Sequence, residues 1–142
     1  MTPVTTEGTE RTVIVGAGGA LDFEPNSFKG GVAGFVENAV QRFVLEFELG
    51  AQSVWGRAGR ELSTDLLCKW PRRLTTSLDL MVGAGPTVVR TERFSWGVEF
   101  AVDLMWWPSR RVGMWTEPVY DLLFRSDKPG TFGATAGPIF GW

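Results

Sequence analysis

Carboxylates are the main side chains in this sequence that could take part in chemistry. Its 142 residues include 16 Asp and Glu residues, no histidine and a single cysteine, Cys68. Histidine is the commonest metal ligand and general base, and zinc sites need histidine or several cysteines. We therefore expect no metal site and no cofactor. Any chemistry would have to use carboxylates to hold a cation or to move a proton.

One stretch shows how these carboxylates are positioned. Residues 94–107, FSWGVEFAVDLMWW, alternate strictly between an apolar face and a face that carries Glu99 and Asp103. A period of two residues predicts a β-strand. At about 3.3 Å per residue, this strand is long enough to cross a membrane when tilted.

Similar segments account for almost all of the chain. We expect residues 1–10 to form a flexible N-terminal tail and residues 11–142 to form a single domain of eight strands. The expected strands cover residues 11–23, 31–40, 42–55, 61–70, 76–90, 94–107, 111–124 and 131–142. A turn of helix is the alternative within AGFVENAVQRFVLEF, residues 33–47, but the flanking glycines and the alternation after Arg42 favour a strand.

Composition and charge exclude several classes of protein. The formal charge of −2 gives no reason to expect a nucleic-acid partner. No run of 18 apolar residues exists, which excludes a helical membrane span. The first ten residues lack the features of a signal peptide. An exported barrel needs one, so we interpret Met1 as a recombinant start on a mature chain.

Aromatic residues are expected to gather at both ends of the strands. Trp70, Trp106 and Trp142 fall at the end that holds both termini, and Trp55 and Trp96 fall at the opposite end. Two aromatic girdles around an apolar band are typical of membrane barrels. A soluble barrel with its apolar face inside is the competing fold. Glycines on the polar face, such as Gly83 and Gly97, favour a narrow interior on that side, so the apolar face should point to lipid.

The chain resembles the small eight-stranded outer-membrane barrels of Gram-negative bacteria. The last strand, TFGATAGPIFGW, ends in an aromatic residue, which is similar to the signal that the barrel assembly machinery recognises in such proteins. The resemblance implies an all-β, antiparallel up-and-down transmembrane barrel that is located in the outer membrane as a monomer and contacts lipid and lipopolysaccharide. Pro86, Pro118 and Pro138 depart from the pattern, because each removes a donor from a predicted strand. We expect bulges or local breaks at these three prolines.

If the apolar face points outward, the polar residues form a network inside the barrel. This predicted interior network comprises Glu46, Glu48, Asp65, Lys69, Asp79, Glu99, Asp103, Arg111, Glu117 and Asp121. So many buried carboxylates have to be paired, hydrated or partly protonated. Trp115 is the aromatic on the polar face that we single out as a candidate ligand contact. The structural explanation for this network is that it fills the barrel with packed polar side chains. The functional explanation is that it forms a path for a cation or a proton.

The sequence favours a structural, anchoring or interaction role without catalysis. One alternative is a soluble lipocalin-like barrel that binds a small apolar ligand. Another is a membrane-embedded enzyme that uses interior carboxylates such as Glu99, Asp103 and Glu117. A serine hydrolase is disfavoured because the chain has no histidine base.

Overall fold

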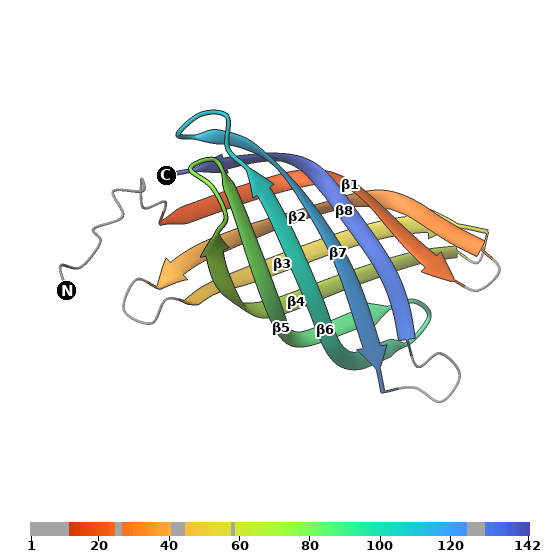
Figure 1. Cartoon of the computed structure of the whole chain (residues 1–142). Helices are drawn as coiled ribbons and strands as arrows, with labels where there is room; N and C mark the ends of the chain where they lie inside the picture. Colours follow the sequence, from red (N-terminus) through yellow and green to blue (C-terminus); the bar gives the residue numbers. More distant parts are fainter. Residues whose placement is uncertain (1–11, 25–26, 41–44, 58, 125–129) are drawn as a thin grey trace.

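The computed structural model describes residues 12–24, 27–40, 45–57, 59–124 and 130–142, and these ranges form a barrel of eight β-strands (Figure 1). The strands are β1 (Val13–Glu24), β2 (Ser27–Val40), β3 (Leu45–Gly56), β4 (Gly59–Arg73), β5 (Leu78–Arg90), β6 (Phe94–Trp106), β7 (Val112–Leu123) and β8 (Gly130–Gly141). In the described ranges no helix is long and apolar enough to span a membrane.

Every strand pairs antiparallel with the next, and β8 pairs with β1, which closes the barrel. The register of the ladders fixes the stagger of the strands. A path of directly paired residues leads once around the barrel through Val13, Asn38, Phe47, Cys68, Ala84, Phe100, Tyr120, Phe132 and Phe23. The path starts and ends on β1, and its ends, residues 13 and 23, differ by ten positions, which is a shear number of ten. Such a stagger requires strands tilted by about 35–45° from the barrel axis.

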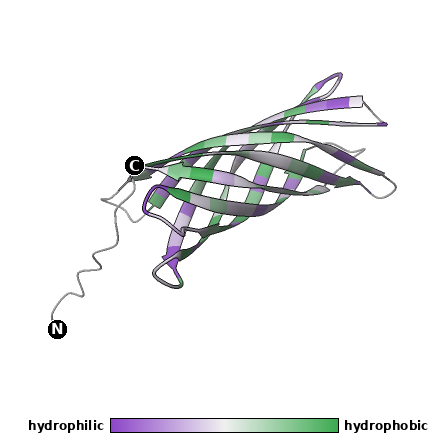
Figure 2. Ribbon diagram, turned by 90° about the horizontal axis from the view of Figure 1, so that it is seen from above, coloured by the Kyte–Doolittle hydropathy of each residue, from purple (hydrophilic) through white to green (hydrophobic). Residues whose placement is uncertain are grey.

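Alternation along the strands separates a buried inner face from an exposed outer face. On β6 the polar residues Ser95, Glu99 and Asp103 are buried, whereas Phe94 and Trp96 are exposed. Figure 2 shows hydrophobic and hydrophilic positions following one another along the ribbons. The apolar side chains therefore cover the outside of the barrel, as the sequence predicted.

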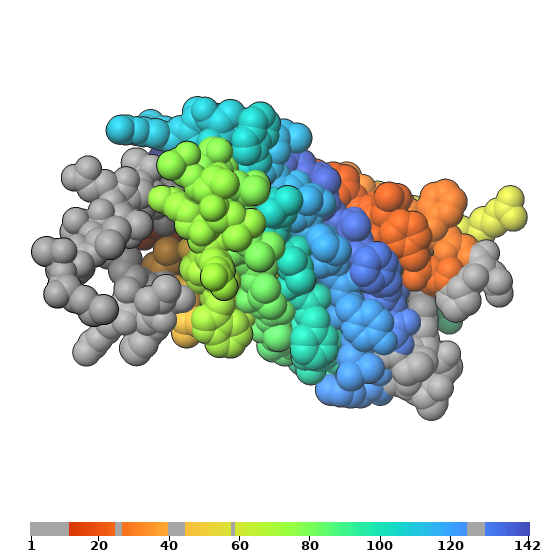
Figure 3. Space-filling model, viewed as in Figure 1, coloured from red at the N-terminus to blue at the C-terminus, as the bar shows by residue number. Residues whose placement is uncertain are grey.

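The outer apolar face is bordered by aromatic side chains at both ends. Trp70, Trp106 and Trp142 are at least half exposed near the chain termini, and Trp55 and Trp96 are exposed at the opposite end. The side chains of β5 to β8 form a continuous outer wall in Figure 3. The 13 residues of β6 measure about 40 Å at about 3.3 Å per residue. With the tilt above they span roughly 30 Å along the axis, which equals the hydrocarbon thickness of a bilayer.

The three prolines for which we expected bulges or breaks interrupt the ladders without changing their register. Pairing skips two positions in the ladder β4–β5 at Pro86, in β6–β7 at Pro118 and in β1–β8 at Pro138. It resumes in the same register beyond each gap. The expected local breaks are therefore present, and no bulge accompanies them.

Two strands are longer than the sequence indicated. β2 begins at Ser27 rather than near Gly31, so that Phe28 and Lys29 belong to a regular strand and not to a turn. β4 continues through Pro71 to Arg73, because this proline still pairs with Met81 in the ladder to β5. The region considered as a turn of helix is a strand up to Val40 and again from Leu45, and Arg42 lies outside the described residues.

Candidate functional site: a carboxylate-rich barrel interior

Lys69 of β4 lies at the centre of the barrel interior and is fully buried. Its Nζ atom is 2.8 Å from Glu117 Oε2 of β7 and 3.7 Å from Glu37 Oε2 of β2. It also donates hydrogen bonds to Glu48 of β3 and Asp103 of β6. We call these five residues the Lys69 cluster. Four strands thus each supply one carboxyl group to a single ammonium group.

Small residues on neighbouring strands create the space for this cluster. Gly83 pairs with Lys69, and a Cβ atom at Gly83 would lie 2.5 Å from the Lys69 Cγ. The ring of Phe35 covers the other side of the ammonium group, at 5.8 Å from Nζ to the ring centroid, within reach of a cation–π contact. Glycine and an aromatic ring therefore fix the position of the long lysine side chain.

A hydrophobic plug fills the barrel between the Lys69 cluster and the end that holds the termini. Its buried members are Ile14, Phe35, Met81, Met105, Trp107, Trp115 and Ile139. Phe35 and Trp115 pack edge to face with their centroids 5.0 Å apart. Since these side chains are almost completely buried, the plug closes the lumen at that end.

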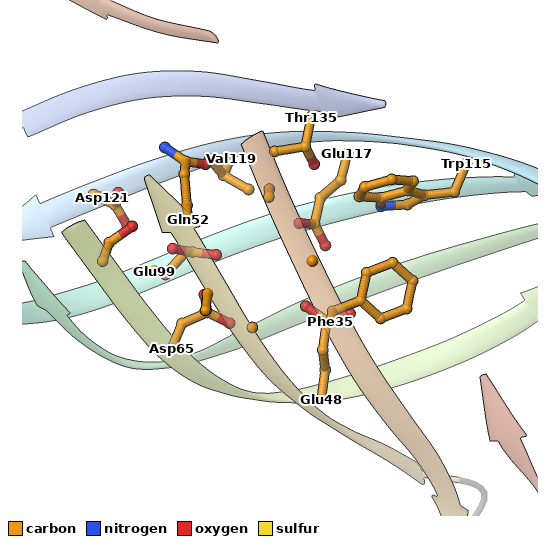
Figure 4. A pocket seen from close by; sticks show the side chains of 15 residues that line it. Phe35, Glu48, Gln52, Asp65, Glu99, Trp115, Glu117, Val119, Asp121 and Thr135 are labelled. Atoms are coloured by element: carbon orange, nitrogen blue, oxygen red, sulfur yellow. The ribbon is translucent and has the colours of Figure 1, made fainter. Parts of the chain in front are cut away.

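A second group of carboxylates lies on the other side of the Lys69 cluster. Asp65, Glu99 and Asp121 line a pocket together with Glu48 and Glu117 of the cluster, and Figure 4 shows their side chains pointing into it. Glu99 and Asp121 are direct partners in the β6–β7 ladder. Close to this pocket Gln52 donates a 2.9 Å hydrogen bond to Asp22. The pocket volume of about 20 Å³ has room for one or two water-sized species, since each needs about 10–15 Å³.

A third charged group closes the interior at the end opposite the termini. Lys29 Nζ lies 3.0 Å from Glu24 and 3.1 Å from Glu61. This pair of contacts joins the hairpin of β1 and β2 to β4. The described interior is therefore layered from the termini outward: apolar plug, Lys69 cluster, acidic pocket and Lys29 group.

The structure places most of the predicted network residues inside the barrel but not all in one site. Asp79 lies near the strand end, where Arg73 Nε donates to it over 3.3 Å, and Glu46 is half-buried opposite Lys69 in the ladder. Arg111 is exposed in the turn between β6 and β7. The remaining predicted residues form the Lys69 cluster and the acidic pocket: Glu48, Asp65, Lys69, Glu99, Asp103, Glu117 and Asp121. Trp115 is 3 % exposed and lines the pocket beside them.

Sequence reasoning missed Glu37, Lys29 and Phe35. All three belong to β2, whose apolar and polar residues do not separate cleanly because Phe35 points inward. The valines at positions 32 and 36 carry the sequence signal that could have found them: if these face lipid, the period of two places Lys29, Phe35 and Glu37 on the inner face.

The arrangement is suited to holding charge and not to a reaction on a large substrate. Lys69 is engaged by four carboxylates, and the pocket is too small for an organic molecule. A lipocalin-like barrel would need a wide apolar cavity. Here the described inner face carries carboxylates and a closely packed apolar plug, and the exposed large apolar residues cover the outside.

Comparisons with known proteins address the fold. No protein-family model matches the sequence, and a search of curated proteins finds no match either. Solved structures do match across nearly the whole chain. The N-terminal β-barrel domain of OprF from Pseudomonas aeruginosa superposes with a TM-score of 0.72 at 10% identity, covering 93% of this chain and 98% of that domain.

Two further outer-membrane structures show the same likeness. The outer-membrane protein OprG from Pseudomonas aeruginosa has a TM-score of 0.69 at 11% identity, with 92% of this chain and 95% of that chain covered. Neisserial surface protein A has a TM-score of 0.67 at 11% identity, with 91% and 94% covered. At such low identity the likeness concerns the fold alone. The chain has the closed, eight-stranded antiparallel meander fold of the small transmembrane β-barrels found in Gram-negative outer membranes.

Proposed function

We propose that the chain is embedded in an outer membrane and has a structural, anchoring or interaction role without catalysis. The observation that carries this proposal is the exposed apolar band around the barrel, bordered by tryptophans such as Trp70 and Trp96. A soluble protein does not expose so large a continuous apolar surface. A closed barrel can do so in lipid, because every strand is paired on both sides.

The rim opposite the termini carries side chains suited to lipid head groups. The guanidinium of Arg60 lies 5.7 Å from the centroid of the Trp55 ring, and that of Arg90 lies 5.3 Å from the centroid of Phe94. Arginine binds phosphate well, and aromatic rings prefer the membrane interface. These pairs support phospholipid or lipopolysaccharide phosphates as contacts at this rim.

Assembly and oligomeric state belong to the same proposal. The last strand ends with Phe140 and Trp142 exposed on the outer face, which supports recognition by the barrel assembly machinery. Because the edges of β1 and β8 are already hydrogen-bonded to one another, the barrel needs no second copy to complete its sheet. We expect a monomer.

Closure of the interior argues against the channel and enzyme alternatives. The plug of Phe35, Trp115 and their neighbours blocks the lumen, and Lys69 engages Asp103 and Glu117. If the interior carboxylates were catalytic, Glu99→Gln, Asp103→Asn or Glu117→Gln would remove an activity. In the role proposed here these changes alter only stability.

The membrane location is tested by refolding the chain with and without detergent micelles or lipid vesicles. We expect an intact barrel to remain associated with detergent or vesicles and to migrate faster on a gel before boiling than after it. A chain that stays soluble as a compact monomer without detergent, and shows no change of migration on heating, would refute the proposal.

A further inference from the structure

Glu37 of β2 has a buried carboxyl group to which no basic residue donates a hydrogen bond. Its side chain is only 1% exposed, and no N–H or O–H group of the described residues donates to either of its oxygens. The Lys69 Nζ atom lies 3.7 Å from the Glu37 Oε2, which is too far for a hydrogen bond. An ammonium group has three hydrogens, and those of Lys69 are directed to Glu48, Asp103 and Glu117. Lys69 therefore has no hydrogen left for Glu37.

A second carboxyl group, that of Glu46, lies within hydrogen-bonding distance of Glu37. Glu46 is on β3, two residues before Glu48, which is the ladder partner of Glu37. The Oε2 atom of Glu46 is buried and likewise receives no hydrogen bond from the part of the chain that the structure describes. Two ionised carboxylates offer only acceptor oxygens and repel one another. A hydrogen bond between them requires a proton on one of the two.

We propose that Glu37 and Glu46 hold one proton between them at neutral pH, which makes the centre of the barrel a proton-binding site. The protonated carboxyl group donates an O–H···O hydrogen bond to the ionised one. A buried oxygen thereby gains its missing partner, and the pair carries a single negative charge. This site goes beyond the structural role proposed above, since it gives the interior a ligand to bind and release.

The groups around the pair favour one negative charge over two. The charged residues that face it are Glu48 of β3, Lys69 of β4, Asp103 of β6 and Glu117 of β7, whereas β1, β5 and β8 contribute Ile14, Met81 and Ile139, which do not ionise. Three carboxyl groups already share the ammonium charge of Lys69, so a second negative charge on the pair would lack a counter-charge. The apolar plug on the terminal side raises the cost of that charge further.

Release of this proton should make the barrel less stable at alkaline pH. Both carboxyl groups are ionised at neutral pH in the unfolded chain, so the folded state carries one proton more than the unfolded state. Stability therefore falls as the pH rises through the range in which the folded pair loses its proton. Two charges then lie side by side and oppose the packing of β2 against β3 at this level.

The test uses infrared spectroscopy of the refolded barrel in lipid vesicles, because the C=O stretch of a protonated carboxyl group is distinct from that of a carboxylate and shifts in D₂O. We expect this signal in the wild-type barrel at neutral pH. Glu37→Gln and Glu46→Gln should each change the same component of the signal, by loss or by a shift in frequency, since each replaces one member of the hydrogen bond. The double variant should lose this component completely.

The matched control is Asp79→Asn, because this carboxylate lies near the strand end beside Arg73, and it should leave the component unchanged. Stability provides a second readout. Between neutral and alkaline pH, the double variant should remove about a tenfold change in the unfolding equilibrium constant per pH unit, which is the contribution of one proton. Asp79→Asn should retain that change. All variants are first shown to fold by their change of migration on heating.

Three results would overturn the proposal. The first is a wild-type barrel without a protonated carboxyl signal at neutral pH, as expected if water bridges two ionised carboxylates; this result requires no variant to fold. The second is a signal that the double variant leaves unchanged, which would assign the proton to another hydrogen-bonded pair, Asp103 with Glu117 or Glu99 with Asp121. The third is a component that only one of the two single variants alters, which would contradict sharing. The membrane location is tested separately by the detergent experiment and does not depend on these outcomes.

Discussion

The Nζ atom of Lys69 lies 2.8 Å from the Oε2 atom of Glu117, so that an ammonium group of β4 meets a carboxylate of β7 across the lumen. The two residues are 48 positions apart in the sequence. Strands on opposite walls are therefore joined through their side chains as well as through the continuous sheet. This contact makes the centre of the barrel an ionic core.

Lys69→Met should lower the stability of the barrel strongly. The substitution leaves Glu37, Glu48, Asp103 and Glu117 facing one another without a counter-charge. Removing one partner from a buried ionic group typically costs about 3–5 kcal/mol. Urea unfolding in lipid vesicles, followed by the migration of the folded band, measures the loss.

The control for this variant is Leu67→Met, which changes a buried residue of the same strand without altering charge. A swap between hydrophobic residues of similar volume should cost less than about 1.5 kcal/mol. If Lys69→Met were as stable as the control, the Lys69 cluster would have no role in stability.

Gly85→Ala should destabilise the barrel through a backbone clash. The new Cβ atom would lie 1.9 Å from the carbonyl oxygen of Leu66, which cannot rotate away as a side chain could. Overpacking of this kind costs about 1–3 kcal/mol. The free energy of unfolding again provides the measurement.

Gly19→Ala is the matched control for Gly85→Ala, because a Cβ atom at Gly19 would meet nothing within 4 Å. Alanine should leave stability unchanged or raise it by about 0.4–1 kcal/mol through the smaller entropy of the unfolded chain. Equal effects of the two substitutions would contradict the close approach of β4 and β5 at Gly85.

Phe100→Arg should reveal the lipid-facing side of the barrel. Phe100 is exposed on the outer face near the middle of β6. Arginine at the midplane of a bilayer costs about 2–4 kcal/mol in such barrels, but only about 0–1 kcal/mol near the interface. Val112→Arg, at the beginning of β7, supplies the interfacial comparison. Equal costs in vesicles would argue against a bilayer around this band.

The double variant Phe35→Ala and Trp115→Ala should open the plug. Both rings are buried and in contact with one another, so their removal leaves a gap at the terminal end of the lumen. We expect no ion conductance from the wild-type barrel in planar bilayers and a measurable leak from the variant. Conductance of the wild-type barrel would contradict closure by the plug.

Much of the fold could be predicted because alternation reports directly on the faces of a strand. Residues 94–107 revealed their apolar and polar faces, and the alternation of side chains along the strands placed Lys69, Glu99 and Asp103 on the inner face. β2 was less clear, since its inward Phe35 breaks the separation of apolar from polar residues. Glu37 was missed for that reason.

The meeting of particular side chains could not be predicted from alternation. Alternation shows that Lys69 and Glu117 point inward, but their height along the barrel axis depends on the stagger of all eight ladders. A shift of two residues in one ladder would preserve both faces and separate this pair. Likewise, the division of the carboxylates between the Lys69 cluster and the acidic pocket depends on the shear number of ten.

Closure of the sheet between β1 and β8 also determines when the molecule can become complete. The edge of β1 that does not face β2 cannot form its hydrogen bonds until β8 has been synthesised, because Ile14 pairs with Gly141. Pairs so distant in sequence form slowly. Until then two open edges remain available to other chains. We therefore expect the unfinished barrel to need protection during its biogenesis, because of its connectivity and not because of any one residue.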